Sequence, residues 1–229
     1  MGEKNLIFNA DDFGFARSVN EGIVKAHVEG VVTSTSLMVT GREVMDAVER
    51  SLEHPRLAVG LHWDVWGEDE RDFDLSDLRA VEREFHTQLD RFRQLMQRDP
   101  THIDSHRHAH RHKHVFGTFR NLVEPLGIPL RDDGRVRFVG NFYAQWEWQV
   151  TELAYIGVPQ LMEWLRDEVH EGWTEFSCHP AIVDDEWDAV YKHEREIELQ
   201  TLIDPHIRAY IDELGIRLRS YADLASESS

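Results

Sequence analysis

Four short apolar segments of this chain each run directly into residues that can bind a metal ion or move a proton. These residues are two carboxylates and three imidazoles, namely Asp11, Asp12, His62, His106 and His179. In parallel α/β architectures the carboxyl ends of the strands share one face, so residues far apart in the sequence meet there. The spacing therefore predicts a single site.

The residue types in this set suit a catalytic metal. One aspartate with two histidines, His62 and His106, is a three-ligand set that leaves coordination positions open for water and substrate. Mixed nitrogen and oxygen ligands favour Zn or another transition metal, whereas Mg usually prefers oxygen alone, and both ions remain candidates. His179 ends a segment expected to be a buried strand, where an imidazole could donate a proton.

Each of these residues also has a purely structural interpretation. Asp11 and Asp12 could form a turn and cap the next helix, because Asp is common at both positions. His62 and His179 could be hydrogen-bonded core histidines. Cys178 could be considered as a nucleophile, but nothing beside it in the sequence suggests an activated thiolate, so we reject a cysteine mechanism.

A histidine cluster surrounds one of the expected ligands. Six of the fourteen histidines fall between His102 and His114. The alternate spacing after His106 would place these rings on one side of an extended segment, although a solvated loop or a helix start fits the pattern equally well. Because three ligands suffice, we expect His112 and His114 to lie outside the site.

Segments rich in β-formers alternate with segments that carry apolar residues three or four positions apart, the pattern of repeated βα units. The expected strands are Leu6–Ala10, Val31–Val39, Leu57–Leu61, Thr101–Ser105, Ile128–Arg131, Glu175–Cys178 and Ile216–Leu218. The expected helices are Ser18–Glu29, Glu43–Leu52, Leu75–Arg98, Val115–Leu126, Gln160–His170 and Tyr191–Leu214. This alternation favours a parallel sheet, open or closed.

Two segments do not follow this pattern. The tryptophan-rich stretch Phe142–Trp148, together with Ala154–Val158 after it, is expected to form a loop with a short strand. The tail Ala222–Ser229 is small and polar, so we expect it to fray. No repeat, low-complexity linker or compositional break divides the chain, and 229 residues with 41% hydrophobic content can bury one core. We therefore expect one domain over residues 1–229.

The charge balance limits the partners. The net charge is -18, with 30% charged residues spread along the chain. Such a surface disfavours nucleic acid and anionic membranes and leaves neutral or cationic substrates. The apolar run Leu6–Phe8 is too short for a signal peptide, and Cys178 is the only cysteine, so we expect a cytoplasmic protein. A homodimer remains open.

Five motifs, in order along nearly the whole chain, resemble those of the YdjC/ChbG carbohydrate deacetylases. They are Asn9–Gly14, Val32–Ser36, Gly60–His62, Thr101–His110 and Cys178–Pro180, and the matched region ends with Arg219–Tyr221. Five ordered motifs are far more specific than any one alone. The resemblance implies a distorted TIM-like (β/α) barrel of about seven parallel strands, one divalent metal ion, and removal of acetyl groups from N-acetylated sugars or oligosaccharides.

The resemblance also assigns roles. Carried over position by position, the metal ligands of the family fall on Asp12, His62 and His106. Its catalytic base falls on Asp11, and His179 would be the general acid.

Further positions are carried over more loosely. Arg131 lies where related deacetylases keep an arginine near the base, and Asp104 could orient a histidine. After His62 the chain departs from the usual family continuation with Trp63–Trp66, and the stretch from there to Thr101 is shorter than in typical members. These departures make the substrate harder to predict than the type of reaction. Tryptophans that could stack on a sugar, although core packing is their commoner fate, are Trp63, Trp66, Trp146 and Trp148.

Two other classes of protein would also gather these residues. A metal-dependent phosphoesterase or amidohydrolase on a similar barrel usually carries a His-x-His pair on its first strand, where this chain has Asp11 and Asp12. A non-catalytic metal-binding or sugar-binding protein could use the histidine cluster. Chelator-sensitive release of acetate from N-acetylglucosamine oligomers would separate the three.

Overall fold

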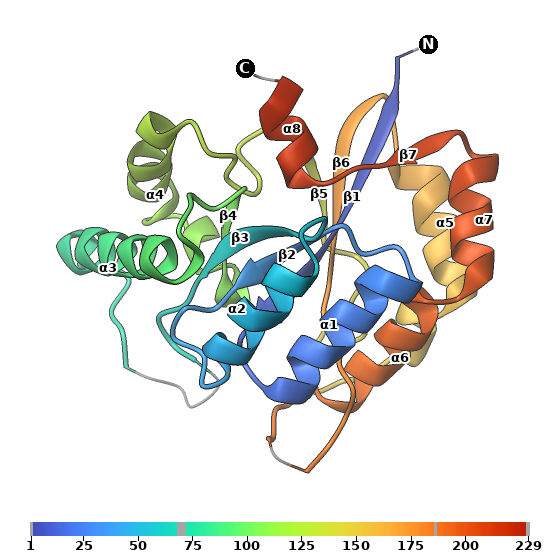
Figure 1. Ribbon diagram of the computed structural model, residues 1–229, viewed down its shortest axis with the longest axis horizontal. Coiled ribbons are helices and arrows are strands. Elements are labelled where there is room, and N and C mark those ends of the chain that lie inside the picture. Colours follow the sequence, from blue (N-terminus) through green and yellow to red (C-terminus); the bar gives the residue numbers. More distant parts are fainter. Residues whose placement is uncertain (1, 68–71, 186, 228–229) are drawn as a thin grey trace.

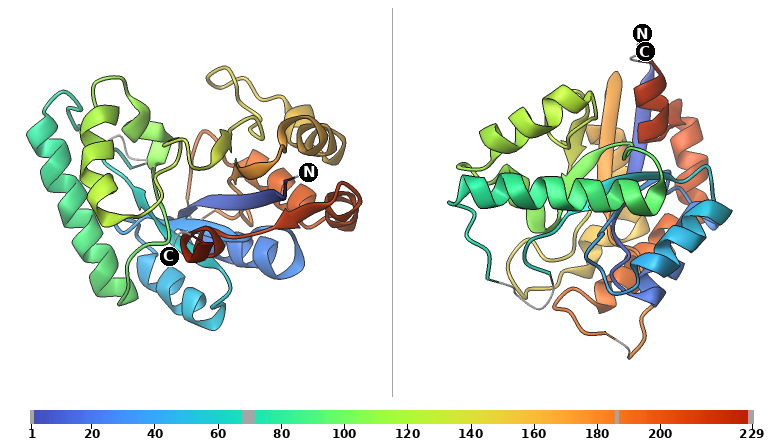
Figure 2. Two further views of the ribbon diagram at one scale, coloured as in Figure 1. Left: turned by 90° about the horizontal axis from the view of Figure 1, so that it is seen from above. Right: turned by 60° about the vertical axis from the view of Figure 1, so that its left-hand side comes forward.

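The computed structural model describes residues 2–67, 72–185 and 187–227, so the ends of the expected 1–229 domain lie outside the described residues. Its centre is a parallel seven-stranded sheet, in the order β4-β3-β2-β1-β6-β5 with β7 also pairing with β1, formed within that part of the chain. The strands curl into a half-barrel with the helices outside it (Figures 1 and 2). The expected class, a distorted TIM-like barrel, is confirmed.

The strands are β1 Lys4–Phe13, β2 Ser34–Leu37, β3 Ala58–Trp63, β4 Ile103–Ser105, β5 Arg137–Val139, β6 Gly172–Cys178 and β7 Ile216–Leu218. The helices are α1 Arg17–Glu29, α2 Val44–Glu53, α3 Leu78–Met96, α4 Phe116–Val123, α5 Val158–Glu168, α6 His193–Leu202, α7 Pro205–Glu213 and α8 Tyr221–Glu227, with short 3₁₀ turns at η1 His106–Arg111, η2 Glu124–Leu126 and η3 Leu153–Ile156. Helix α3 packs on α4, α1 on α2 and α6, and α5 on α7 (Figure 1). None of the described helices is long and apolar enough to cross a membrane.

Strand β1 is the axis of the sheet. One edge pairs with β6 from Lys4 to Ala10, while the other edge pairs first with β7 and then with β2. Nearly every position of β1 is buried, which agrees with the unbroken apolar run Leu6–Phe8 within it. Every strand that carries an expected site residue thus lies in one sheet built around β1.

The expected strand Ile128–Arg131 is wrong. Only a single bridge joins Ile103 of β4 to Leu130, and the chain then turns through two residues with positive φ, Asp132 and Gly134. Pro129 also has no backbone N–H to donate, which shortens any ladder here. The strand that the sequence pattern missed is β5, which pairs with β6.

Two further expectations, one for a helix and one for a strand, are wrong. The expected helix Tyr191–Leu214 is two helices, α6 and α7, because Asp204 caps a new helix through the His206 N–H and Pro205 cannot continue the previous one. The segment Ala154–Val158 contains no strand, because η3 precedes the start of α5 there.

The tail is ordered through Glu227 instead of frayed, and the rest of the segment expected to fray, residues 228–229, lies outside the described residues. Tyr221 at the start of α8 is buried and donates its hydroxyl to Glu175 Oε2 at 2.6 Å. Its ring stacks on His102 with centroids 3.9 Å apart. These contacts hold α8 against β6 and against the residue that precedes β4, and a terminal segment held in this way does not fray.

We expect Tyr221→Phe to lower the free energy of unfolding by about 1–3 kcal/mol, because it leaves a buried carboxylate without one of its donors. Urea denaturation measures the change. Ser226→Ala, on the exposed side of the same helix, should stay within about 0.5 kcal/mol of the wild type. Equal stability of Tyr221→Phe and wild type would show that the hydroxyl contact does not stabilise the fold.

Candidate active site

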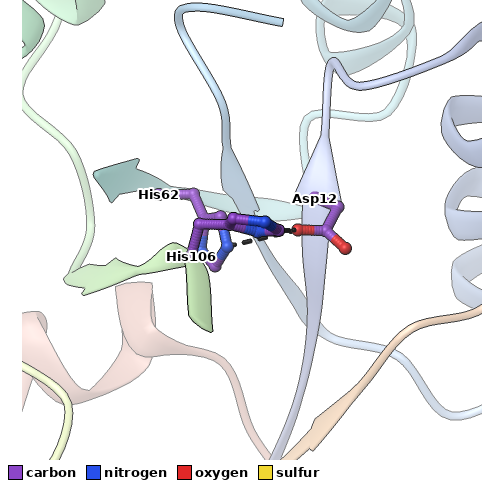
Figure 3. A group of neighbouring side chains, drawn as sticks. All are labelled: Asp12, His62 and His106. Carbon is purple, nitrogen blue, oxygen red and sulfur yellow. Dashed lines mark hydrogen bonds and ion pairs between the residues drawn. The ribbon is translucent and has the colours of Figure 1, made fainter. Parts of the chain in front are cut away.

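The ends of β1, β3 and β4 bring Asp12, His62 and His106 together, as Figure 3 shows. One ligand atom from each lies within 4.8 Å of the others, and all three residues are buried. Asp12 Oδ1 is 3.3 Å from His62 Nε2 and 3.1 Å from His106 Nδ1. One carboxylate oxygen thus faces two imidazole nitrogens.

A bulge at the end of β1 gives the two neighbouring aspartates different partners. The pairing of β1 with β2 shifts register between Ala10 and Phe13, and Asp12 has φ +70°. Asp is one of the few residues that adopt this left-handed conformation readily. Asp12 therefore faces the two histidines, while Asp11 faces a buried arginine, Arg131.

The ring of His62 is held by groups behind it. Its Nδ1 lies 2.7 Å from Asp104 Oδ1 and 3.1 Å from Ser36 Oγ, so Nδ1–H can donate to the carboxylate while Nε2 faces Asp12. Asp104 makes the contact expected of it, one that raises the basicity of a metal-ligating imidazole. Burial lowers the pKa of His62, but Asp104 and Asp12 raise it well above its ordinary value, so a cation would displace a proton from this ring.

Gly60 allows β3 to approach β4 this closely. A Cβ at that position would lie 2.4 Å from the ring of His102 and 2.6 Å from its carbonyl oxygen. Glycine is therefore required for this close approach, two residues before His62.

The second oxygen of Asp12 has its own partner. Arg195, from α6, donates from Nη2 to Asp12 Oδ2 at 2.6 Å. Burial raises the pKa of Asp12, but Arg195, His106 and His62 bring it well below its ordinary value, so the carboxylate is ionised. Sequence reasoning missed Arg195, because nothing in the sequence indicates which arginine of a distant helix reaches the site.

These donors fit a divalent cation. Ligands about 2.1 Å from a tetrahedral ion lie about 3.4 Å from one another, close to the 3.1 and 3.3 Å that separate Asp12 Oδ1 from the two imidazole nitrogens. A second group of potential ligands, Asp11, His62 and Asp104, also lies close together. The guanidinium of Arg131, which is itself a cation, already occupies the space beside both carboxylates: it donates hydrogen bonds to Asp11 and forms an ion pair with Asp104.

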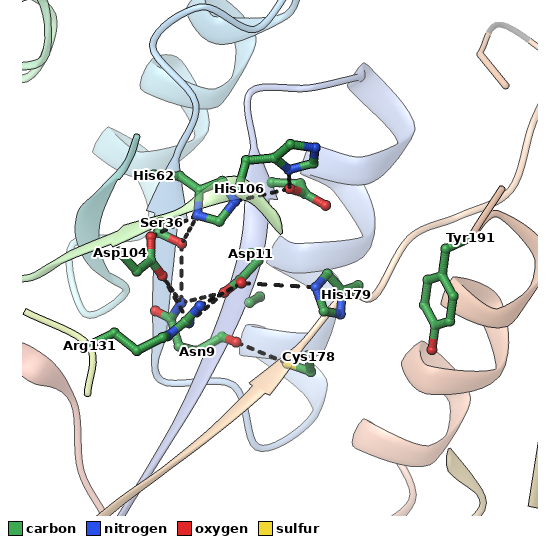
Figure 4. Close-up of polar contacts among 12 residues, drawn as sticks. Asn9, Asp11, Ser36, His62, Asp104, His106, Arg131, Cys178, His179 and Tyr191 are labelled. Carbon is green, nitrogen blue, oxygen red and sulfur yellow. Dashed lines mark hydrogen bonds and ion pairs between the residues drawn. The ribbon is translucent and has the colours of Figure 1, made fainter. Parts of the chain in front are cut away.

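Arg131 binds Asp11 with both arms of its guanidinium, at 2.8 Å from Nη1 to Oδ2 and 2.7 Å from Nη2 to Oδ1. It also contacts Asp104 and Glu175, at 2.9 and 2.7 Å. Burial raises the pKa of Asp11, but Arg131 outweighs it and lowers the pKa below its ordinary value. Arg131 is fully buried, so it acts on the site through Asp11 (Figure 4).

His179 lies at the end of β6, between two carboxylates. Its Nε2 is 3.9 Å from Asp11 Oδ2, and its Nδ1 is 3.9 Å from Glu198 Oε1. Glu198, on α6, also accepts from the backbone N–H of His179 and from the hydroxyl of Tyr191. Burial lowers the pKa of His179, but Glu198 and Asp11 raise it overall, so the ring is more readily protonated than an ordinary histidine.

Glu198 is the second residue that sequence reasoning missed. The spacing of Arg195 and Glu198 places them on one face of α6. That spacing was the only available signal, and it does not distinguish a buried face from a solvated one. Here both residues are buried.

Cys178 has no part in this chemistry. Its thiol is buried against the carbonyl oxygen of Asn9 at 3.4 Å, and burial raises its pKa well above the ordinary value. A protonated, enclosed thiol is not a nucleophile. The rejection of a cysteine mechanism agrees with this environment.

The histidine cluster between His102 and His114 does not form an extended strand, so its rings do not share one side and have different surroundings. Arg107 and His108 both have positive φ within the 3₁₀ turn η1, so the structure agrees better with the start of a helix than with an extended segment. His110 contacts Ser105 Oγ and the carbonyl oxygen of Arg131, and burial lowers its pKa to about 3. The late histidines, His112 and His114, are exposed.

A cavity of about 740 Å³ opens over these groups. Its floor carries the aspartates and histidines described above, and its wall carries aromatic and small apolar residues. Of the four tryptophans considered for sugar stacking, Trp146 and Trp148 line it. Trp63 is packed in the core against Phe119, with ring centroids 4.9 Å apart, and cannot reach the cavity.

Comparison with known proteins identifies the family. A match to the family described as YdjC-like protein covers residues 5–213. The chain belongs to this YdjC-like family. A chitooligosaccharide deacetylase of Salmonella dublin is 30% identical to this YdjC-like protein over 260 aligned positions, which span 97% of this chain and 100% of the relative. The corresponding Salmonella paratyphi B protein has the same identity and coverage.

Solved structures extend the comparison. A candidate cellobiose-phosphate cleavage protein of Enterococcus faecalis V583 superposes with a TM-score of 0.76 at 27% identity, covering 97% of this YdjC-like protein and 99% of that chain. The Xyl-CE4 domain of a xylanase from the hindgut metagenome of Trinervitermes trinervoides gives a TM-score of 0.61 at 10% identity, covering 99% and 91%. At that identity the second likeness shows a shared fold alone.

We expect Asp12→Ala to weaken metal binding by about 10-fold or more, because it removes the charged oxygen that both histidines face. Titration calorimetry with Zn and with Mg measures this. Asp11→Asn is the matched neighbour and should keep the metal affinity while turnover falls by about 10²–10⁴.

His112→Ala and His114→Ala should leave the metal content near that of the wild type. Equal metal loss from the Asp11 and Asp12 variants would mean that both carboxylates bind the ion. Metal loss from a His112 or His114 variant, with none from His106→Ala, would overturn the ligand assignment.

Proposed function

We propose that this protein is a metal-dependent carbohydrate deacetylase that removes acetyl groups from N-acetylated sugars or oligosaccharides. The observation that carries the proposal is a buried group of Asp12, His62 and His106 beside an arginine-bound Asp11 and a histidine, His179, at the floor of one cavity. Family membership and chitooligosaccharide deacetylase relatives that align over their full length support the substrate class.

The metal site that we propose consists of Asp12, His62 and His106 with one divalent ion, Zn or Mg. One oxygen and two imidazole nitrogens suit Zn better than Mg, which prefers oxygen ligands. A bound ion supplies two effects, a lower pKa for water and a polarised acetyl carbonyl. Arg195 would keep Asp12 ionised and fix which of its oxygens faces the histidines.

Asp11 is the proposed general base. Hydrolysis of an acetamide forms a bond from a water oxygen to the carbonyl carbon, and the water must lose a proton as that bond forms. Arg131 holds the Asp11 carboxylate ionised and in one orientation, so it can accept this proton. In this role Arg131 is a positioning residue.

His179 is the proposed general acid. When the carbon–nitrogen bond breaks, the sugar nitrogen needs a proton to leave as an amine, with acetate as the other product. The raised pKa of His179 keeps that proton available, and Glu198 behind the ring stabilises the charged form. The acid and the base are neighbours, with 3.9 Å between His179 Nε2 and Asp11 Oδ2.

The alternatives are less consistent with this arrangement. A phosphoesterase or amidohydrolase of the kind considered above would carry its histidine pair at the end of β1, where this chain has Asp11 and Asp12. A non-catalytic binding protein would have no need of a paired acid and base beside the ion.

The single buried cysteine agrees with a proposed location in the cytoplasm.

We expect the purified protein to release acetate from N-acetylglucosamine oligomers, to lose this activity on treatment with a chelator, and to regain it with added Zn. Enzymatic determination of acetate over a panel of N-acetylated sugars measures it. Asp11→Asn is the control for contaminating activity. Metal binding without acetate release from any of these sugars would favour the non-catalytic alternative, and hydrolysis of phosphate esters instead would favour the phosphoesterase.

We expect the pH profile of kcat/KM to depend on an ionised Asp11 and a protonated His179. Because the pKa of His179 is raised, the alkaline decline should lie above the ordinary histidine value of about 6.5. Glu198→Gln removes the charge behind the ring, so it should shift that decline to lower pH with unchanged metal content. Glu196→Gln, exposed on the same helix, should leave it in place, and an unshifted profile in Glu198→Gln would exclude His179 as the acid.

A further inference from the structure

One loop beside the cavity presents two tryptophans to solvent. The tryptophan loop, Ala144–Glu152, is closed at its base by a hydrogen bond from Glu152 N to Ala144 O at 2.8 Å. At its tip, Val150 N donates to Glu147 O at 3.0 Å, and Gln149 has φ +62°. This is a tight turn, and Trp148 occupies its second position.

The tryptophan loop is tied to the helix that carries Arg195 and Glu198. Gln145 Nε2 donates to Glu194 Oε1 at 2.7 Å, and Thr151 donates to the same oxygen. Ala144 N also donates to the hydroxyl of Tyr191 at 3.1 Å, next to the acid side of the site. The loop is therefore held in a fixed position relative to the catalytic groups.

Both tryptophans expose large apolar surfaces in spite of this anchoring. Trp146 is 54% exposed and Trp148 is 68% exposed. Trp146 stacks on Tyr155, with centroids 4.5 Å apart and planes 22° apart, so its orientation is fixed. Two exposed indole rings on a loop held in place by hydrogen bonds are uncommon unless a ligand covers them.

The cavity extends from the catalytic floor to these rings. Tyr143 belongs to its inner wall, 5.6 Å from the ring of His179 and stacked on Tyr191 at 4.2 Å. Trp146 and Trp148 belong to its exposed wall. A volume of about 740 Å³ falls within the range of about 300–1,000 Å³ that holds a drug-sized ligand, which is larger than a single sugar ring.

We propose that Trp146 and Trp148 bind a second sugar ring, adjacent to the ring whose acetamide group reacts, and so make the protein prefer N-acetylated oligosaccharides over the monosaccharide. This inference rests on the proposed function. A sugar ring has apolar C–H faces and a polar edge, which match the flat face and the N–H of an indole.

Trp148 is the better residue to test, because it is the more exposed and lies at the tip of the turn. The test compares kcat and KM of wild type and Trp148→Ala on N-acetylglucosamine and on its β-linked di- and trisaccharides. We expect the preference in kcat/KM for the disaccharide over the monosaccharide to fall about tenfold, the usual scale for losing an aromatic anchor, mainly through KM.

Two further variants control the comparison. Trp148→Phe keeps an aromatic face and should recover most of the preference. Val150→Ala removes another exposed apolar side chain from the same turn, one that does not line the cavity, and should match the wild type. An unchanged preference in Trp148→Ala, or an equal loss in Val150→Ala, would overturn the inference.

Binding measured without turnover separates this inference from the proposed function. Calorimetry with the trisaccharide, on two proteins that both carry Asp11→Asn to stop turnover, should show about tenfold weaker binding when Trp148→Ala is added. If the wild type released no acetate from any N-acetylated sugar but still bound the trisaccharide through Trp148, the proposed function would fail and the second-ring site would stand. Equal binding by the two proteins would reject the site, whatever the activity.

Discussion

The buried guanidinium of Arg131 is the group on which the rest of the structure depends. It joins carboxylates from three strands, Asp11 of β1, Asp104 of β4 and Glu175 of β6, and all four side chains are buried. Burying charges is costly unless each has partners, and removing one partner leaves an uncompensated charge inside the protein. The same contacts join β1, β4 and β6 and orient the proposed base, so the fold and the proposed reaction depend on one set of interactions.

This arrangement creates two positions for positive charge side by side. Arg131 occupies one, and the group of Asp12, His62 and His106 forms the other. Asp104 touches both, because one of its oxygens contacts His62 and the other contacts Arg131. A positive charge at one position therefore changes the electrostatic environment of the other. Two neighbouring positive charges need several carboxylates to balance them, although two of the three proposed metal ligands are imidazoles.

The parts of the site that sequence could predict are those set by strand ends. Asp11, Asp12, His62, His106 and His179 each follow an expected strand, and the common face of a parallel sheet brings such residues together. Arg195 and Glu198 could not be found in this way, because they reach the site from a helix, where sequence spacing does not indicate which face is buried. Similarly, β5 is short and follows a turn, so neither its length nor its pattern marked it. The break between α6 and α7 could have been predicted from Asp204, a helix-capping residue, followed by Pro205. The apolar periodicity that continues across this break instead favoured one long helix.

The contacts that build the site also span most of the chain. Asp12 and Arg195 are 183 residues apart, and Asp11 and Arg131 are 120 apart. Contacts at such separations require large loops to close first, so they form late and slow the folding of a domain. In a partly folded chain the ligand residues would still be far apart, so the metal site would not yet exist. A metal ion that binds the assembled ligands would then bind only the native state and stabilise the molecule as a whole, by mass action.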